Sequence, residues 1–185
     1  KKFSSGTFDG QGHTISGLTI AATSGNTGLF AETGSGAVVQ GIVLQDANVS
    51  LSSGSYVGVG ALVGRVSGAT EIRDCGVSGS VSTSSSSALY VGGLVGYVYE
   101  KTTVDGCYGA ASVTGGSYSS GKVGGLIGYT YSAADVSNCY VTGEVTSKGA
   151  AAGALGYFST SSSNKVTLTN CYAACDVGGS ASYRY

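Results

Sequence analysis

A short segment rich in glycine and leucine recurs along this chain at a nearly fixed spacing, and this recurrence limits the possible folds most strongly. The segment occurs at Gly28–Ala31, Gly60–Gly64, Gly92–Gly96, Gly124–Gly128 and Gly153–Gly156. Its central leucines, at steps of 33, 32, 32 and 29 residues, are Leu29, Leu62, Leu94, Leu126 and Leu155. Such regularity predicts a stack of similar units, each contacting mainly its neighbours. Function should therefore be sought in rows of equivalent residues.

Composition excludes several classes of protein. The 185 residues are 42% hydrophobic, which is enough for one domain with a sizeable core. Only 10% are charged and the net charge is −1, whereas nucleic-acid binding requires clustered Lys and Arg. No apolar run approaches the roughly 18 residues of a membrane span. We therefore expect no nucleic-acid partner and no membrane insertion.

The first residues, Lys1-Lys2-Phe3-Ser4, lead into polar sequence and not into the apolar stretch of a signal peptide. We therefore expect the sequence to begin after processing or to be an excerpt of a longer protein. The organisation within it is local, because the repeats follow one another without long linkers.

One repeat predicts three short strands. Tyr90–Val98 is rich in β-forming residues, and its glycines disfavour a helix, so it is expected to be a single strand. Further strands are expected at Thr102–Val104 and Ala111–Val113, with a turn at Asp105–Gly106. No helix signal interrupts the unit.

One position in each repeat holds only Gly, Asp or Asn, the residues that best tolerate a left-handed backbone. These residues are Gly41, Asp74, Gly106, Asn138 and Asn170. They predict a sharp corner between two strands, so that the apolar residue before the corner and the residue after it both point inward. The residues after the corner are Ile42, Cys75, Cys107, Cys139 and Cys171.

Three short strands joined by corners, repeated about every 32 residues without helices, predict an all-β parallel β-solenoid (β-helix). About five repeats would each form one three-stranded rung, with equivalent residues stacked roughly 4.8 Å apart. Two smaller rungs per repeat are disfavoured, because the inward positions repeat at 32 and not at 16; antiparallel hairpins are the main competing architecture. Residues 1–25 are expected to be a lead-in or capping coil and residues 26–185 one continuous solenoid domain.

The sequence resembles the GLUG-motif repeat proteins at Val91–Gly96, Val123–Gly128, Val136–Gly143 and the opening Phe8–Ile15. The resemblance extends from about residue 3 to residue 177. It implies a secreted or cell-surface (extracellular) location, because such repeats occur in large microbial surface proteins, including adhesins and some immunoglobulin A peptidases. In those peptidases the catalytic machinery lies outside the repeats, so the resemblance carries over no catalytic residue.

Four cysteines form a row at steps of 32 residues, namely Cys75, Cys107, Cys139 and Cys171. Their Cα atoms would lie near 5 Å apart in neighbouring rungs, within the range of a disulfide. We favour buried thiols that pack as small hydrophobic groups, since Ile42 occupies the same row. Metal binding is disfavoured because no histidine accompanies them and a strand ladder is not a tetrahedral cage. Cys175 makes the number odd and is either buried or a candidate for an intermolecular bond.

Catalytic chemistry is not predicted, and neither is a cofactor or a metal. His13 is the only histidine, and we expect it to form a hydrogen bond at a turn. The ten acidic residues are scattered, whereas polysaccharide-cleaving β-helices require clustered carboxylates. The chain is therefore expected not to be an enzyme.

Two sets of residues are candidates for an outward contact surface. Strand alternation places tyrosines outside in rows, namely Tyr97, Tyr129, Tyr108, Tyr140 and Tyr172. They would either stack across rungs and protect the sheet or bind a partner chain or sugar rings. If the leucines point inward, Val95 and Ile127 point outward and form an apolar stripe that marks an interaction site. Another part of this chain, a missing domain or a second copy would cover it.

These observations predict a non-enzymatic secreted or cell-surface structural module, as a stalk, an adhesin segment or a self-associating filament subunit. The open edges of a solenoid make end-to-end stacking available. The expected partner is a second copy, giving a homo-oligomer or filament, or else another surface protein or a glycan. The alternative is a carbohydrate- or protein-binding module that presents the outward tyrosine rows.

Overall fold

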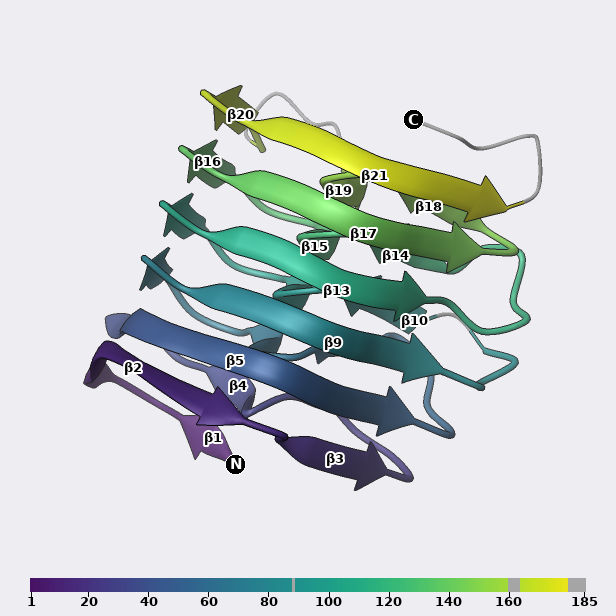
Figure 1. Ribbon diagram of the computed structural model, residues 1–185, viewed down its shortest axis with the longest axis horizontal. Helices are drawn as coiled ribbons and strands as arrows, with labels where there is room; N and C mark the ends of the chain where they lie inside the picture. Colours follow the sequence, from purple (N-terminus) through teal and green to yellow (C-terminus); the bar gives the residue numbers. More distant parts are fainter. Residues whose placement is uncertain (88, 160–163, 180–185) are drawn as a thin grey trace.

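A computed structural model describes residues 1–87, 89–159 and 164–179, and every regular element in these residues is a β-strand. The strands form three parallel sheets wound into a solenoid of about five turns (Figure 1). The six-stranded sheet contains β1 (Lys2–Phe3), β4 (Phe30–Thr33), β7 (Val63–Val66), β11 (Val95–Val98), β15 (Ile127–Thr130) and β19 (Leu155–Phe158). The four-stranded sheet contains β6 (Val57–Gly60), β10 (Leu89–Gly92), β14 (Lys122–Gly124) and β18 (Ala150–Ala152).

The third sheet has eleven strands and turns at the predicted corner in each coil. Before the corner lie β8 (Thr70–Arg73), β12 (Thr102–Asp105), β16 (Ala134–Ser137) and β20 (Val166–Thr169). After the corner lie β9 (Gly76–Thr83), β13 (Tyr108–Thr114), β17 (Tyr140–Ser147) and β21 (Tyr172–Gly179). The strands β2 (Gly6–Ser16) and β5 (Ala37–Leu51) run through the corner, and β3 (Thr19–Ala22) pairs with the end of β5.

Strands stack in register with their equivalents one period later. Val95 pairs with Ile127, Val104 with Val136 and Val113 with Val145, in parallel and always 32 residues apart. This pairing confirms the parallel solenoid with one rung per repeat. It also excludes antiparallel hairpins and two smaller rungs within each repeat.

The segment Tyr90–Val98 differs from the prediction, because it forms two strands, β10 and β11, separated by a bend at Gly93–Leu94. A full rung therefore has four short strands and not three. Since the chain changes direction at the bend, Leu94 and Val95 both point into the core and are 0% exposed. Ile127, the equivalent of Val95 in the next coil, is also 0% exposed. The prediction that Val95 and Ile127 face outward is therefore wrong.

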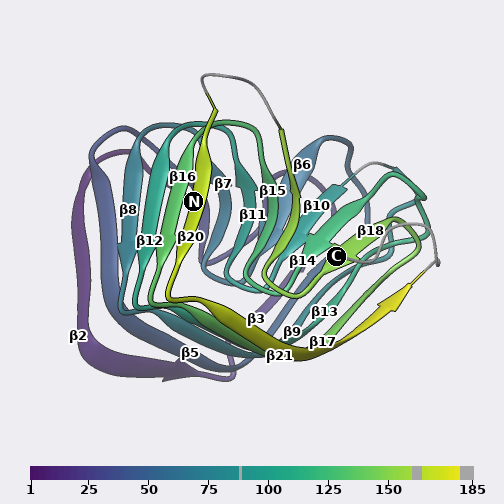
Figure 2. The same ribbon diagram turned by 90° about the horizontal axis from the view of Figure 1, so that it is seen from above.

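Glycines allow the bend to pack closely against neighbouring backbone. A Cβ on Gly96 would overlap the backbone nitrogen of Val59, and a Cβ on Gly125 would overlap the side chain of Val141 in β17. Figure 2 shows the four- and six-stranded sheets meeting at this bend, close to the strands that follow the corner. The chain itself therefore covers both faces of the leucine segment.

The interior consists of rows of equivalent apolar side chains. One row, 2% exposed or less, is Val39, Ile72, Val104 and Val136. A second row, 0% exposed throughout, is Val49, Val81, Val113 and Val145. Within the described residues, no helix is long and apolar enough to cross a membrane.

The two ends of the stack depart from the middle. Within residues 1–25, the strands β1, β2 and β3 pair with β4 and β5, so this segment stacks as a coil of its own. In the last coil Leu155 pairs with Ile127, while Leu126 donates its backbone N–H to the carbonyl of Ala154 at 3.0 Å. Ala154 therefore occupies the leucine row. The assignment of Leu155 to that row was wrong by one residue, because backbone pairing and not the motif sets the register.

Candidate functional site

The first tyrosine row lies on the outer side of the bend, where rings from the four- and six-stranded sheets pack against one another. Tyr97, Tyr129 and Tyr157 stand in register on β11, β15 and β19. Tyr90 reaches across from β10, with ring-centroid distances of 4.7 Å to Tyr97 and 4.6 Å to Tyr129. The ring of Tyr90 thus lies between two rings of the opposite sheet, which leaves Tyr97 only 9% exposed.

Two cationic side chains lie over rings of this row. The guanidinium carbon of Arg65, the neighbour of Tyr97 in the six-stranded sheet, lies 5.3 Å from the centroid of Tyr97. The ammonium of Lys122, the neighbour of Tyr90 in the four-stranded sheet, lies 4.4 Å from the centroid of Tyr157. Cation–π contacts of this kind stabilise partly buried sites by about 0.5–2 kcal/mol. We call these six residues, Tyr90, Tyr97, Tyr129, Tyr157, Arg65 and Lys122, the tyrosine notch.

Burial changes the protonation equilibria in the tyrosine notch. Loss of solvent, with the neighbouring phenols of Tyr129 and Tyr56, raises the pKa of Tyr90 to about 12. Burial also raises the pKa of Tyr97 and lowers the pKa of Lys122. Burial therefore makes the phenols of Tyr90 and Tyr97 harder to ionise than an exposed tyrosine. The notch is a packed seam between two sheets.

The second tyrosine row lies at the start of the strands that follow the corner. Tyr108 and Tyr140 stack at 5.3 Å with an interplanar angle of 9°, and Tyr140 and Tyr172 at 5.6 Å and 10°. Tyr140 is 36% and Tyr172 60% exposed. Because the rings cover one another's faces, the row presents mainly ring edges to solvent. A sugar that stacks on an aromatic face would find such a face only at the Tyr172 end.

The corner positions carry the predicted residue types for a conformational reason. Positive φ occurs at Gly41 (63°), Asp74 (49°), Gly106 (63°), Asn138 (53°) and Asn170 (53°). At Asp74 and Gly106 this conformation turns the next backbone N–H toward the core. There the N–H of Cys75 donates to the sulfur of Cys107 at 3.4 Å, and the N–H of Cys107 to the sulfur of Cys139 at 3.4 Å.

The cysteine row is therefore a ladder of hydrogen-bonded thiols. The thiol of Cys75 donates to the carbonyl of Arg73 at 3.0 Å, and that of Cys139 to the carbonyl of Ser137 at 3.0 Å. Hydrogen bonds with the thiols of Cys139 and Cys75, together with burial, raise the pKa of Cys107. All five cysteines are free thiols, with Cys171 and Cys175 half-buried. In the described part of the chain, no three His, Cys, Asp or Glu side chains are arranged to hold a metal ion.

The acceptor role of the thiols was missed in the sequence. The available signal was that each of the four cysteines in the row follows a residue that adopts positive φ. A residue after such a corner has its N–H turned away from the regular ladder, and a small side chain with a weak acceptor can satisfy that N–H inside the core.

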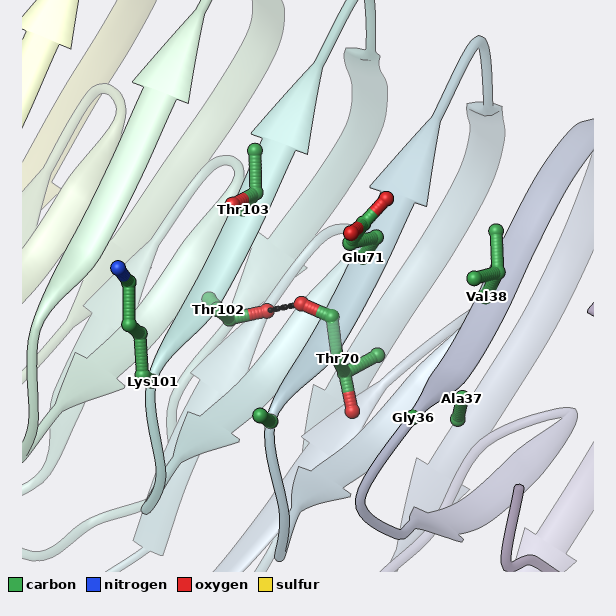
Figure 3. A pocket seen from close by; sticks show the side chains of 9 residues that line it. Gly36, Ala37, Val38, Thr70, Glu71, Lys101, Thr102 and Thr103 are labelled. Carbon is green, nitrogen blue, oxygen red and sulfur yellow. Dashed lines mark hydrogen bonds between the residues drawn. The ribbon is translucent and has the colours of Figure 1, made fainter. Parts of the chain in front are cut away.

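A hollow of about 260 Å³ lies over the strands that precede the corner (Figure 3). Its wall includes Glu71, Lys101 and Thr102, and the hydroxyl of Thr102 donates to the carbonyl of Thr70 at 2.9 Å. Glu71 forms an ion pair with Arg73. The one carboxylate lining this hollow is therefore already paired, and no second carboxylate lines it to complete an acid–base pair.

Other acidic residues act at corners. Asp105 accepts hydrogen bonds from the hydroxyl of Ser137 at 2.6 Å and the amide of Asn138 at 2.8 Å, and these bonds lower the pKa of Asp105. Asp9 accepts from the backbone N–H of Gln11 at 2.8 Å. His13 is exposed on β2 beside Ile42, and a hydrogen bond at its side chain stays a prediction.

The structure thus places the predicted site residues in three settings. Leu62, Leu94, Leu126, Cys75, Cys107 and Cys139 are buried in the core, whereas Leu29, Leu155 and Cys171 at the ends are half-buried. Tyr97 and Tyr129 belong to the tyrosine notch, and Tyr108, Tyr140 and Tyr172 form the outer row. Val95 and Ile127 lie in the core. The two tyrosine rows therefore belong to separate surfaces.

The geometry defines a parallel β-solenoid whose repeated residues contact their equivalents in the next coil. The family model of the GLUG motif matches residues 55–82 and 119–146, so the chain contains GLUG-motif repeats. Both matches include a strand of the four-stranded sheet, the glycine–leucine bend, the corner and most of the strand after the corner. No curated protein and no solved structure matches this chain.

Proposed function

We propose that this chain is a non-enzymatic structural segment, a stalk or spacer built from stacked coils. The observation that carries the proposal is the unbroken strand pairing from β1 to β19 in one sheet and from β20 to β21 in another, where the register shifts between Asp9 and His13 and between Leu44 and Ala47. The leucine, cysteine, corner and tyrosine positions each contact their equivalents in a neighbouring coil. The repeated residues therefore serve coil-to-coil contact, as expected of a stack whose units contact mainly their neighbours.

A secreted or cell-surface location, as in an adhesin stalk, is part of the same proposal. Its support is the resemblance to repeats of large microbial surface proteins. In such a protein each added coil would lengthen the stack by about 4.8 Å without changing its cross-section. The segment would then set the distance between the parts of the protein that it joins.

A binding module remains a second candidate, favoured by the exposure of Tyr140 and Tyr172 in one outer row. A glycan or protein ligand would contact the ring edges or the free face of Tyr172. This candidate predicts saturable binding on a glycan array that is lost in Tyr140→Ala and Tyr172→Ala. Tyr118→Ala, an exposed tyrosine outside the row, is the matched control.

The structural proposal is tested by removing one period. Deleting residues 91–122 joins Tyr90 to Val123 and preserves the register, because Tyr90 pairs with Lys122 and Val91 with Val123. We expect this chain to keep a β-sheet circular dichroism spectrum, to unfold cooperatively and to be shorter in small-angle X-ray scattering by about 4.8 Å. Deleting only residues 91–106, half a period, should abolish cooperative unfolding. An unfolded one-period deletion would contradict the proposal.

A further inference from the structure

Tyr99 and Tyr131 form a stacked pair of rings just beyond the ends of two neighbouring strands. Tyr99 directly follows β11, and Tyr131 directly follows β15. The backbone N–H of Tyr99 donates to the carbonyl of Val66 at 3.0 Å, and that of Tyr131 donates to the carbonyl of Val98 at 2.8 Å. Both residues are therefore held in the same way by the coil before them. Their ring centroids lie 5.5 Å apart, with an interplanar angle of 9°.

This pair differs from the stacked pair of the tyrosine notch in its access to solvent. Tyr97 and Tyr129 stack with similar geometry, at 5.4 Å and 13°, but Tyr97 is only 9% exposed. Tyr99 is 38% and Tyr131 47% exposed. The chain thus holds two equivalent ring pairs in the same two coils, one packed and one open.

The open pair is a row of two rings. The positions one coil before Tyr99 and one coil after Tyr131 hold Ser67 and Ser159, whose backbone N–H groups make the same hydrogen bond to the coil before them. In the outer row, by contrast, Tyr140 stacks on two rings. A reaction between stacked rings of the open pair would therefore have a single product.

Arg65 fixes one of the two rings. Its guanidinium carbon lies 4.4 Å from the centroid of Tyr99, a cation–π contact. Arg65 belongs to the coil before Tyr99, and Tyr131 belongs to the coil after it. The ring of Tyr99 therefore lies between the guanidinium and the ring of Tyr131, which keeps it beside its partner.

We propose that Tyr99 and Tyr131 are a site of oxidative coupling, at which a dityrosine bond joins two neighbouring coils. The co-substrate is a peroxide used by a one-electron oxidant such as a haem peroxidase. Each phenol loses one electron and one proton and becomes a phenoxyl radical. The radicals combine through ring carbons next to the oxygens, and the hydrogens on these carbons move to the oxygens and restore both phenols. In total the protein loses two hydrogens, and one hydrogen peroxide becomes two waters.

Coupling requires rings that are held close together and can still turn from a face-to-face to an edge-to-edge arrangement. The strand register supplies the first condition, and the exposure of Tyr99 and Tyr131 beyond the strand ends supplies the second. In the tyrosine notch, Tyr90 lies 4.7 Å from Tyr97 and 4.6 Å from Tyr129, so these rings have no room to turn. The reaction is therefore specific to the open pair.

The coupling site rests on the ring geometry and extends the structural function proposed above. Tyr99 and Tyr131 are 32 residues apart, so the bond would close a loop of one period and tie one coil to the next. A cross-link of this kind restricts the unfolded chain and so favours the folded stack. The modification would reinforce a stalk or spacer without changing its surface elsewhere.

The test is oxidation of the whole chain with a haem peroxidase and hydrogen peroxide. A dilute sample disfavours coupling between molecules, and the fraction of monomeric mass is isolated by size exclusion. Trypsin cleaves after Lys and Arg, which places Tyr99 on peptide 74–101 and Tyr131 on peptide 123–148. Mass spectrometry identifies linked peptides, and dityrosine fluorescence identifies the bond.

We expect monomers in which peptides 74–101 and 123–148 are linked, with a mass two hydrogens below their sum. Tyr99→Phe and Tyr131→Phe should each lose this product, because phenylalanine keeps the ring but forms no phenoxyl radical. Tyr118→Phe should retain it, although Tyr118 is exposed to the same extent as Tyr99, at 38%. Tyr97→Phe should also retain it, which separates the open pair from the tyrosine notch.

Two results would overturn the coupling site. One is the absence of the linked peptides in oxidised chain that keeps a β-sheet circular dichroism spectrum, and the other is their persistence in Tyr99→Phe. Either result leaves the structural function intact, because the one-period deletion tests that function without oxidation.

Discussion

Cys107 shows how single residues meet two requirements of a coiled stack at once. Its sulfur accepts the backbone N–H of Cys75, and its own N–H donates to the sulfur of Cys139. The side chain is 1% exposed, so no water can replace either partner. Cysteine is small and apolar enough for the core and still accepts a hydrogen bond from the N–H that follows a corner.

The thiol ladder predicts different effects for two substitutions of similar size. Cys107→Ala removes the acceptor of the buried Cys75 N–H and should lower the free energy of unfolding by about 1–3 kcal/mol. Cys107→Ser keeps an acceptor and should cost less. Urea denaturation followed by circular dichroism measures both. If the serine variant is the less stable of the two, the thiol acts only by packing.

The corner residues allow a second test at the residue scale. Asn138 has φ of 53°, which a residue with a Cβ adopts at a cost of roughly 1–2 kcal/mol. Both Asn138→Gly and Asn138→Ala lose the amide bond to Asp105, so their difference isolates the backbone effect. We expect the alanine variant to be less stable than the glycine variant by about 1 kcal/mol in thermal or urea unfolding. Equal stability would mean that the corner relaxes to negative φ.

At the scale of elements, the bend between β10 and β11 organises the rung. It brings Leu94 and Val95 into the core, and on its outer side tyrosines of both sheets pack against one another. Without these rings the two sheets would expose their facing surfaces to water. The tyrosine notch thus packs the two sheets against each other on the outer side of the bend.

Tyr90→Ala tests this role of the notch. The ring of Tyr90 contacts both Tyr97 and Tyr129, and its loss should lower the free energy of unfolding by about 2 kcal/mol, less than for a fully buried aromatic side chain. Tyr118→Ala, at an exposed tyrosine, should change stability by about 0.5 kcal/mol or less. Equal losses of stability for the two substitutions in urea denaturation would show that the tyrosine notch does not stabilise the fold.

The notch also predicts how stability depends on alkaline pH. The pKa of Tyr90 is about 12 in the folded chain, above the ordinary value of 10, because burial disfavours the phenolate. Its contribution to stability is therefore complete below pH 10 and is lost as the pH rises toward 12. Absorbance at 295 nm should reveal phenols that ionise only well above pH 10, one fewer in Tyr90→Phe. Titration of every tyrosine near pH 10 in a folded chain would contradict this prediction.

The sequence predicts those elements in which residue type and backbone conformation are tied together. The 32-residue period, the corners at Gly, Asp and Asn and the row of small core residues after them are all of this kind. The bend was missed because alternation along Tyr90–Val98 was interpreted as one strand, although two adjacent apolar residues flanked by glycines already indicated a change of direction. The contact of Tyr90 with Tyr97 and Tyr129 exists only because the bend brings β10 and β11 together. It could therefore not be inferred from a sequence interpretation that lacked the bend.

At the scale of the whole molecule, stability is distributed along the stack. Each interior coil of the described chain buries its rows against two neighbouring coils. The register of the last coil was misassigned because it was taken from the motif letters and not from the pairing with the coil before it. The motif letters placed Leu155 in the leucine row, but the pairing with the coil before it placed Ala154 there.

The in-register stack of one coil per repeat is tested most directly by a distance between residues one period apart. Nitroxide labels at Thr114→Cys and Thr146→Cys, with Cys171 and Cys175 replaced by Ser, would lie on paired positions of β13 and β17. Labels at Ser82 and Thr146, two coils apart, are the control. We expect strong dipolar broadening for the first pair, whose backbones lie about 5 Å apart, and weaker broadening at about 10 Å for the second. Absence of broadening for Thr114 and Thr146 would contradict the stack and the function built on it.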